Sequence, residues 1–171
     1  MMEFIKSDGW AFAFKKEDED ILLKIISSLS DKYLDGKIFL PHITCFRDTK
    51  SSKLRHDKLI NSIKKIKPFE IKLNKISFEK RIFKTLFIEV EPSHQMTEVV
   101  NIFEKEFDQI YDFNPHISLI YKEELDYAER EKLSNSLKFP INIKVNALLR
   151  YSNDSFANNF ANWETERIDF D

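Results

Sequence analysis

The hydrophobic and polar positions along the chain change their period several times, which predicts a mixture of strands and helices. Short apolar or alternating runs predict strands, and they lie at residues 10–14, 38–46, 69–78, 83–90, 115–121, 139–151 and 163–170. Apolar positions three or four residues apart predict helices, and they lie at residues 18–34, 51–66, 96–111 and 126–137. Because both kinds of element occur along the whole chain, the pattern indicates the α+β fold class.

The order of these elements occurs twice. Each unit runs strand, helix, strand, helix and alternating strand, and matching segments lie about 72 to 75 residues apart. For example, FEIKLNK at 69–75 matches INIKVNA at 141–147. Such a duplication is typical of two similar half-domains. We therefore expect one domain over residues 1–171, with lobes at about 1–80 and 81–171 related by a pseudo-twofold axis, whose antiparallel sheets form a central cleft.

The third predicted element of each unit carries the same short motif, PHIT in the first repeat and PHIS in the second. Residues two apart on a strand point to the same side, so His42 shares a face with Thr44 and His116 shares a face with Ser118. If the lobes face each other, two imidazoles and two hydroxyls converge on one cleft. Imidazoles serve as general base and acid near neutral pH, and hydroxyls donate hydrogen bonds to phosphate oxygens.

A structural explanation competes with this one, because two H-x-[ST] triplets also arise by chance and buried histidines occur in ordinary cores. Here both triplets follow proline, share the isoleucine, lie in apolar strands and occupy matching places in the repeat. These added constraints favour a functional pair. The set suits hydrolysis of a cyclic phosphodiester, which needs a base for the attacking water and an acid for the departing ribose oxygen.

Composition excludes several other kinds of site. The chain has two glycines in 171 residues, too few for a Walker or Rossmann phosphate loop. Its single cysteine, Cys45, excludes an internal disulfide and a cysteine-based zinc or iron–sulfur site. The 27 basic and 29 acidic residues nearly cancel, so no global basic field favours duplex DNA. We expect no metal and no cofactor.

The two motifs and their surroundings resemble the two-histidine (2H) phosphoesterase superfamily, which is defined by a duplicated H-x-[ST] motif in a bilobal α+β, LigT-like fold. PHITCF and PHISLIY are most similar to the cyclic phosphodiesterase branch known from plants and yeast. The segment RIFKTLFIEVEP at 81–92 also resembles that branch's strand before its second long helix. The similarity spans about residues 10–151.

The resemblance implies a function and roles for particular residues. The branch opens ADP-ribose 1″,2″-cyclic phosphate and nucleoside 2′,3′-cyclic phosphates. The resemblance implies that His116 is the general base and His42 the general acid, although the two roles can be exchanged. It implies that Thr44 and Ser118 bind the phosphate. It also implies that Tyr121 contacts substrate, although strict strand alternation turns Tyr121 away from His116 unless the strand bends or ends there.

Three further residues are candidates for substrate binding from their positions alone. Trp10 begins the first strand, where it either stacks on a base or ribose or belongs to the core. Phe83 and Lys84 occupy the matching place in the second repeat, where the aromatic ring could line the cleft and the ammonium could contact phosphate.

Several alternatives and expectations complete the sequence interpretation. The first rival enzyme is an RNA 2′,3′-cyclic phosphodiesterase of the 2′-5′ RNA ligase type, acting on RNA ends, and the second degrades cyclic oligonucleotides. The rival from another class is a noncatalytic nucleotide- or RNA-binding module. We expect a small nucleotide cyclic phosphate as the substrate, a monomer and a cytoplasmic location. The chain shows no signal peptide and no run of apolar residues long enough to span a membrane.

Overall fold

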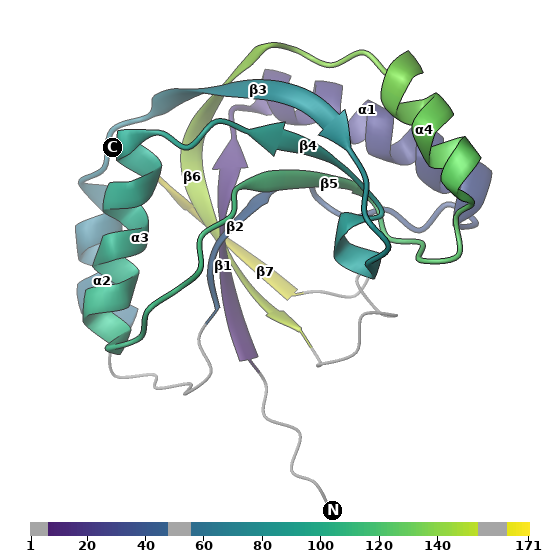
Figure 1. Ribbon diagram of the computed structural model, residues 1–171. Helices are drawn as coiled ribbons and strands as arrows, with labels where there is room; N and C mark the ends of the chain where they lie inside the picture. The colour runs from purple at the N-terminus through teal and green to yellow at the C-terminus, as the bar shows by residue number, and fades with distance from the viewer. Residues whose placement is uncertain (1–6, 48–55, 154–163) are drawn as a thin grey trace, which may run out of the picture.

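A computed structural model describes residues 7–47, 56–153 and 164–171 of the chain (Figure 1). The described elements, in chain order, are β1 (Ser7–Phe14), α1 (Lys16–Tyr33), β2 (Ile43–Arg47), α2 (His56–Lys64), β3 (Phe69–Ser77), the short 3₁₀ helix η2 (Ile82–Lys84), β4 (Leu86–Val90), α3 (His94–Phe107), β5 (His116–Ile120), α4 (Tyr127–Ser136), β6 (Asn142–Asn153) and β7 (Glu164–Asp169).

All paired strands are antiparallel and form one seven-stranded sheet in the order β2-β1-β6-β3-β4-β5, with β7 added beside β6. The order confirms the duplication. If β1 is matched with β4, β2 with β5 and β3 with β6, the sequence of strands reads the same from either end. Among the strands of the described residues, β7 has no counterpart in the first repeat.

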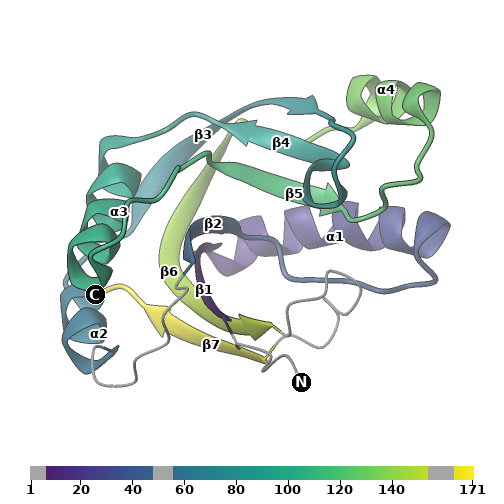
Figure 2. The same ribbon diagram turned by 60° about the horizontal axis from the view of Figure 1, so that its bottom comes forward.

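The sheet bends strongly, and its two end strands approach one another. Figure 2 shows β4 and β5 on one side of the molecule and β1 and β2 on the other, and β2 contacts β5. The third strand of each repeat lies beside the first strand of the other repeat, because β3 pairs with β4 and β6 pairs with β1. This exchange joins the two repeats through the central β3–β6 pair.

The helices follow the same symmetry. α1 and α4 lie side by side at one end, where Glu129 accepts hydrogen bonds from Lys32 and Tyr33 (Figure 1). α2 and α3 contact each other at the other end. Each pair therefore combines the first helix of one repeat with the second helix of the other.

An aromatic core lies between the sheet and the α3 end of the molecule. Phe46 of β2 stacks against Phe103 and Phe107 of α3, with ring centroids 5.4 and 5.2 Å apart. Trp10 of β1 joins the same cluster, with its ring 5.2 Å from that of Phe103. Burial of such large rings is the main source of stability here, and it fixes the β2 backbone from the core side.

The structure moves the bounds of three predicted elements. The strand predicted at 38–46 begins only at Ile43, because residues 38–42 have no strand partner in the described sheet. The strand predicted at 83–90 begins at Leu86, after the η2 turn. α3 ends at Phe107 rather than at residue 111, because Asp108 adopts a left-handed φ of 50°. Residues 51–55 of the predicted second helix lie outside the described residues.

No helix in the described parts of the chain is both long enough and apolar enough to cross a membrane.

Candidate active site

Each motif strand carries one extra residue that interrupts its alternation. On β2, Thr44 pairs with Ala11 and Phe46 pairs with Trp10, so Cys45 has no partner position on β1. On β5, Ser118 pairs with Phe87 and Ile120 pairs with Leu86, so Leu119 is the extra residue. These are β-bulges, which re-aim the side chains that follow them.

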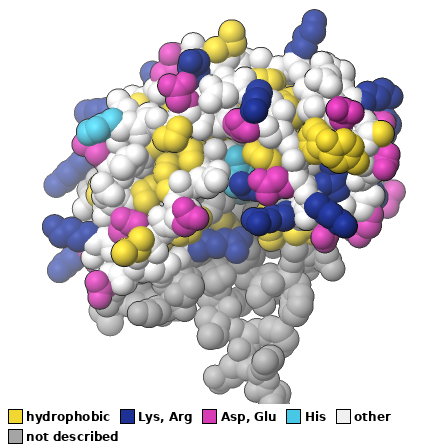
Figure 3. Space-filling view, in the orientation of Figure 1, with side chains coloured by type: hydrophobic (Ala, Val, Ile, Leu, Met, Phe, Trp, Pro, Cys, Tyr) yellow, Lys and Arg dark blue, Asp and Glu magenta, His cyan; other side chains and the backbone are white. Residues whose placement is uncertain are grey.

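The bulges bring the residues five positions after each histidine back to the face of that histidine. Without the bulge, Arg47 and Tyr121 would point away from Thr44 and Ser118. With it, both line one pocket together with the two histidines. The pocket measures about 150 Å³, and its lining consists of His42, Thr44, Arg47, Phe83, Tyr111, His116, Ser118, Tyr121 and Tyr151. Figure 3 shows a histidine side chain at the bottom of a hollow in the middle of one face.

Both histidines are held in the same way. His42 Nδ1 lies 2.8 Å from the backbone oxygen of Leu40, and His116 Nδ1 lies 2.8 Å from that of Asn114. A carbonyl oxygen only accepts hydrogen bonds, so Nδ1 carries the hydrogen in each ring. In both rings, Nε2 is therefore the nitrogen that can exchange a proton with a ligand in the pocket.

The two imidazoles differ in their tendency to hold a proton. Burial lowers the pKa of His42 from 6.5 to about 4, and the nearby charges of His116 and Arg47 act in the same direction. Burial also lowers the pKa of His116. There the charge of Lys84 lowers the value further, whereas that of Glu79 raises it. Both rings are thus neutral near pH 7, and His42 resists protonation chiefly because it is buried.

The two hydroxyls of the motifs have different partners. Thr44 Oγ1 lies 3.5 Å from the phenol oxygen of Tyr151. Ser118 donates a hydrogen bond of 2.7 Å to the backbone oxygen of Phe83. The Thr44 hydroxyl can therefore donate a hydrogen bond to a bound phosphate and lose only its long contact with Tyr151. Ser118 must first break its short hydrogen bond to the Phe83 oxygen before it can donate to a phosphate.

The prediction that Tyr121 reaches the cleft is compatible with the pocket lining, and the Leu119 bulge supplies the bend it required. Its ring stacks on Phe39 with centroids 4.1 Å apart. Burial raises the pKa of the Tyr121 phenol far above its ordinary value, and a hydrogen bond with Ser118 opposes this in part. The phenol therefore stays protonated and acts as a hydrogen-bond donor at any ordinary pH.

The other candidates have different positions. Phe83 lines the pocket, with its ring 5.4 Å from that of Tyr121. Trp10 is fully buried against Phe103, so the prediction that it stacks on substrate is wrong for this conformation and the core interpretation holds. Lys84 is not part of the pocket lining. Its ammonium lies 3.4 Å from a Glu79 carboxylate oxygen and over the Phe87 ring, and it influences His116 only through its charge.

Sequence reasoning missed three pocket residues, Arg47, Tyr111 and Tyr151. Arg47 carried a usable signal, because it stands in the first repeat where Tyr121 stands in the second. The position of Tyr151 in the pocket depends on the pairing of β6 with β1, which no local sequence pattern shows. Tyr151 pairs with Gly9, where an added Cβ would fall 2.2 Å from the Tyr151 ring. The glycine thus gives the ring its place beside His42, 5.8 Å away between centroids.

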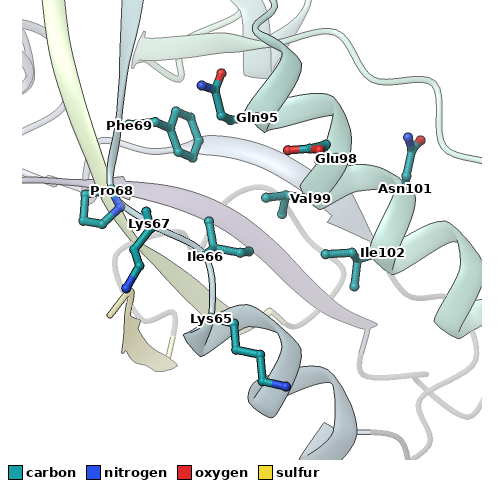
Figure 4. A pocket seen from close by; sticks show the side chains of 10 residues that line it. All are labelled: Lys65, Ile66, Lys67, Pro68, Phe69, Gln95, Glu98, Val99, Asn101 and Ile102. Carbon is teal, nitrogen blue, oxygen red and sulfur yellow. The ribbon is translucent and has the colours of Figure 1, made fainter.

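A second, larger pocket of about 630 Å³ lies between α2 and α3, away from both motifs (Figure 4). Figure 4 shows apolar Ile66, Val99 and Ile102 in it, with Lys65 and Glu98 at its sides. Its lining contains no histidine and no hydroxyl residue. Size alone does not make a catalytic site, so the smaller pocket with both imidazoles is the candidate active site.

The described residues contain no group of three or more histidine, cysteine or carboxylate side chains arranged to hold a metal ion. The described residues that line the pocket include no carboxylate either. The groups that can act on a ligand there are two imidazoles, aliphatic and phenolic hydroxyls, and one guanidinium.

Comparisons with known proteins agree with this description. A family model described as cyclic phosphodiesterase-like protein matches residues 10–162. E. coli LigT complexed with 3′-AMP has a similar structure, with a TM-score of 0.54 and 14% identity over 98% of this chain and 96% of that one. A structure described as a phosphoesterase gives a TM-score of 0.57 and 13% identity over 96% of this chain and 98% of that one. No curated protein sequence matches.

The structural likenesses show the fold, and they confirm the predicted bilobal, LigT-like α+β architecture. The family model shows more, because it covers most of the chain and includes both histidine motifs. The chain therefore belongs to the cyclic phosphodiesterase-like proteins, a family of two-histidine phosphoesterases.

Proposed function

We propose that the chain hydrolyses ribose cyclic phosphates, either nucleoside 2′,3′-cyclic phosphates or ADP-ribose 1″,2″-cyclic phosphate, by metal-independent acid/base catalysis. One observation carries this proposal. Two imidazoles from the two matching motifs line one pocket, and a backbone carbonyl fixes the same tautomer in each ring. A binding module needs no such pair, whereas cleavage of a phosphodiester by water needs one group to take a proton and another to give one.

The reaction balances with these groups alone. The base takes a proton from water as the water oxygen bonds to phosphorus. The bond from phosphorus to one ribose oxygen breaks, and the acid protonates that oxygen. The product is a ribose phosphate monoester. The base then holds the proton taken from water and the acid has lost one, so return of that proton to the acid restores both imidazoles for the next turnover. The hydroxyls of Thr44 and Ser118 donate to the nonbridging oxygens, where negative charge develops.

The surroundings of the histidines favour an exchange of the roles that the resemblance implied. His42 has a pKa of about 4, so it stays neutral and able to accept a proton. Burial and the Lys84 charge also lower the pKa of His116, but the hydrogen bond with the Asn114 backbone oxygen and the Glu79 carboxylate oppose them there. We therefore assign the base to His42 and the acid to His116. A bound phosphate anion raises both pKa values and charges His116 first.

Two further observations support a small substrate. The pocket volume of about 150 Å³ is that of a few water molecules, which suits a ribose phosphate better than a folded polynucleotide. E. coli LigT, which shares this fold, has been crystallised with phosphate and with 3′-AMP. We accordingly propose a phosphate-bearing nucleotide as the ligand class of this chain. We also propose that the chain acts as a monomer.

The test is a substrate panel assayed in EDTA. It contains adenosine 2′,3′-cyclic phosphate, ADP-ribose 1″,2″-cyclic phosphate, RNA ending in a cyclic phosphate and a cyclic dinucleotide. We expect turnover of the first two, with the product identified by its sensitivity to phosphatase. Turnover of RNA ends alone would support the RNA enzyme instead, and binding of all four without turnover would support a noncatalytic module.

A further inference from the structure

Tyr151 of β6 lines the active-site pocket, and its side chain is buried. Its backbone pairs with Gly9 of β1 on one side and with Thr165 of β7 on the other, so the sheet fixes its position. Its ring lies 5.8 Å from that of His42, and its phenol oxygen lies 3.5 Å from Thr44 Oγ1. The phenol therefore lies beside the imidazole and the hydroxyl of the first motif.

The chain reserves space for this ring at Gly9. A Cβ added to Gly9 would overlap with the ring carbons and the phenol oxygen of Tyr151. The other glycine, Gly36, has a φ of 77°, which favours glycine because of its backbone conformation. Gly9 has no positive φ, so the close approach of the Tyr151 ring is the feature of the structure that accounts for a glycine there.

Each motif hydroxyl has a phenol beside it, but the two phenols come from different places. In the second repeat a hydrogen bond joins Ser118 with Tyr121, the residue that follows β5. In the first repeat the residue at the position of Tyr121 is Arg47, so β2 provides no phenol for Thr44. Tyr151 provides this phenol from β6 instead. The first motif thus depends on a residue about a hundred positions away in the chain.

The direction of the contact between Thr44 and Tyr151 decides what Thr44 can do. A hydroxyl has one hydrogen, which it donates to one acceptor at a time. If Tyr151 accepts that hydrogen, Thr44 has none to give to a phosphate. If the phenol donates to Thr44 Oγ1, the Thr44 hydrogen can turn to a nonbridging phosphate oxygen. Hydrogen bonds in such a chain also polarise and strengthen one another.

We propose that Tyr151 is a positioning residue of the active site, whose phenol donates a hydrogen bond to Thr44 Oγ1 and directs the Thr44 hydrogen to the reacting phosphate. This inference rests on the proposed function and adds one residue to its machinery. Negative charge develops on the nonbridging oxygens as the reaction proceeds, so a well-oriented donor stabilises the transition state more than the bound substrate. The contribution of Tyr151 should therefore appear in kcat rather than in KM.

The experiment is a double-mutant cycle of Tyr151→Phe and Thr44→Val, with kcat and KM measured on adenosine 2′,3′-cyclic phosphate. Tyr151→Phe removes one oxygen and keeps the ring in the space opposite Gly9. Urea titrations verify that each variant is folded. The matched control is Tyr33→Phe, which removes the phenol on α1 that donates a hydrogen bond to Glu129, outside the pocket.

We expect Tyr151→Phe to lower kcat by about threefold to tenfold with little change in KM, as for the loss of one neutral hydrogen bond. In the Thr44→Val background the same change should have no further effect, because the phenol acts through the hydroxyl that is already missing. Tyr33→Phe should keep the wild-type kcat.

A second readout separates the orientation of the hydroxyl from a general loss of structure. The two diastereomers of adenosine 2′,3′-cyclic phosphorothioate carry sulfur in place of one or the other nonbridging oxygen, and sulfur is a weak hydrogen-bond acceptor. Tyr151→Phe should slow the diastereomer whose oxygen faces Thr44 more than the other one. The ratio of the two rates then changes in the same direction as in Thr44→Val, whereas a structural defect lowers both rates by one factor.

Two results would overturn the inference. One is an unchanged kcat in Tyr151→Phe, and the other is a pair of losses that multiply in the double variant, because the phenol then acts independently of Thr44. If the wild type turns over no cyclic phosphate, the proposed function fails, and calorimetric Kd values for adenosine 2′-phosphate in the same four proteins test the inference separately. Non-additive losses of affinity would support it, and additive losses or no loss would overturn it.

Discussion

β2 and β5 have the same bulged backbone arrangement but carry different side chains around it. The histidine stands just before β2 and at the start of β5, and the hydroxyl residue follows two positions later. A bulge then returns the residue five positions after the histidine to the same face. Each imidazole donates through Nδ1 to the backbone oxygen two residues before it, at 2.8 Å in both cases. The two motifs thus present their histidines and hydroxyls alike.

The strands differ in everything that surrounds those groups. The residue after the bulge is cationic Arg47 on β2 and neutral Tyr121 on β5. The hydroxyl of Thr44 has only a long contact with Tyr151, whereas Ser118 donates to a carbonyl at 2.7 Å. The lesson is that a duplicated backbone brings two similarly held imidazoles to one pocket, and the divergent neighbours give them different surroundings.

The largest expected effect comes from removing either histidine. His42→Ala and His116→Ala should each lower kcat on a 2′,3′-cyclic nucleotide by about 10²-fold to 10⁴-fold, because each deletes one proton-transfer group. The assay is initial-rate kinetics, with circular dichroism to verify folding. His94→Ala, which changes an exposed histidine on α3, is the matched control and should keep full activity. Full activity in either motif variant would end the catalytic assignment.

The second prediction compares the two imidazoles through the stability of the fold. Well above pH 6.5, the ordinary pKa of the imidazole, His42 is neutral in both the folded and the unfolded chain. As the pH falls toward 4, the unfolded chain gains a proton that the folded chain refuses, so the wild type loses up to about 3 kcal/mol of its free energy of unfolding. His42→Gln lacks this loss. Urea titrations at pH 7 and pH 4 measure the difference.

His116→Gln should remove a loss of the same sign, because burial lowers the pKa of His116 as well. If the wild type and His42→Gln lose equal stability between the two pH values, His42 is not held neutral by its surroundings. The assignment of the base to His42 then loses its physical ground.

The third prediction separates the two hydroxyls. Thr44→Val and Ser118→Ala should each reduce kcat, since each removes a donor to the phosphate. We expect about a tenfold loss for Thr44→Val and a smaller one for Ser118→Ala, because Ser118 gives up its bond to the Phe83 oxygen in order to act. Steady-state kinetics on one substrate suffice. Unchanged rates in both variants would remove the hydroxyls from the mechanism.

The smallest expected effect is that of chelation. The proton transfers and the charge stabilisation that we propose use side chains alone, so wild-type kcat should be unchanged after dialysis against EDTA. The measurement compares rates before dialysis, after it and after addition of Mg²⁺, Mn²⁺ or Zn²⁺. A loss on dialysis that one of these ions restores would contradict a mechanism without metal.

Much of the fold and part of the site could be predicted from the sequence. Period and repeat gave the duplicated order of elements, because burial on one face leaves a regular pattern of apolar positions. The shared face of His42 with Thr44 and of His116 with Ser118 followed from strand geometry alone. These features depend on residues close together in the chain.

The rest depended on pairing between distant segments. The bulges at Cys45 and Leu119 are visible only against the partner strands β1 and β4, so Arg47 was missed, and strict alternation alone could not account for Tyr121 in the pocket lining. Trp10 looked equally suited to stacking and to the core, and only the position of α3 placed it against Phe103. Tyr151 reaches the pocket because Gly9 lies opposite it.

The central claim is that His42 and His116 act as one catalytic unit. It is tested most directly by a double-mutant cycle, in which kcat on adenosine 2′,3′-cyclic phosphate is measured for the wild type, His42→Ala, His116→Ala and the double variant. Groups that act in a single step are strongly non-additive. We predict that the double variant is about as slow as the slower single variant. Losses that multiply would show two independent histidines and contradict the account.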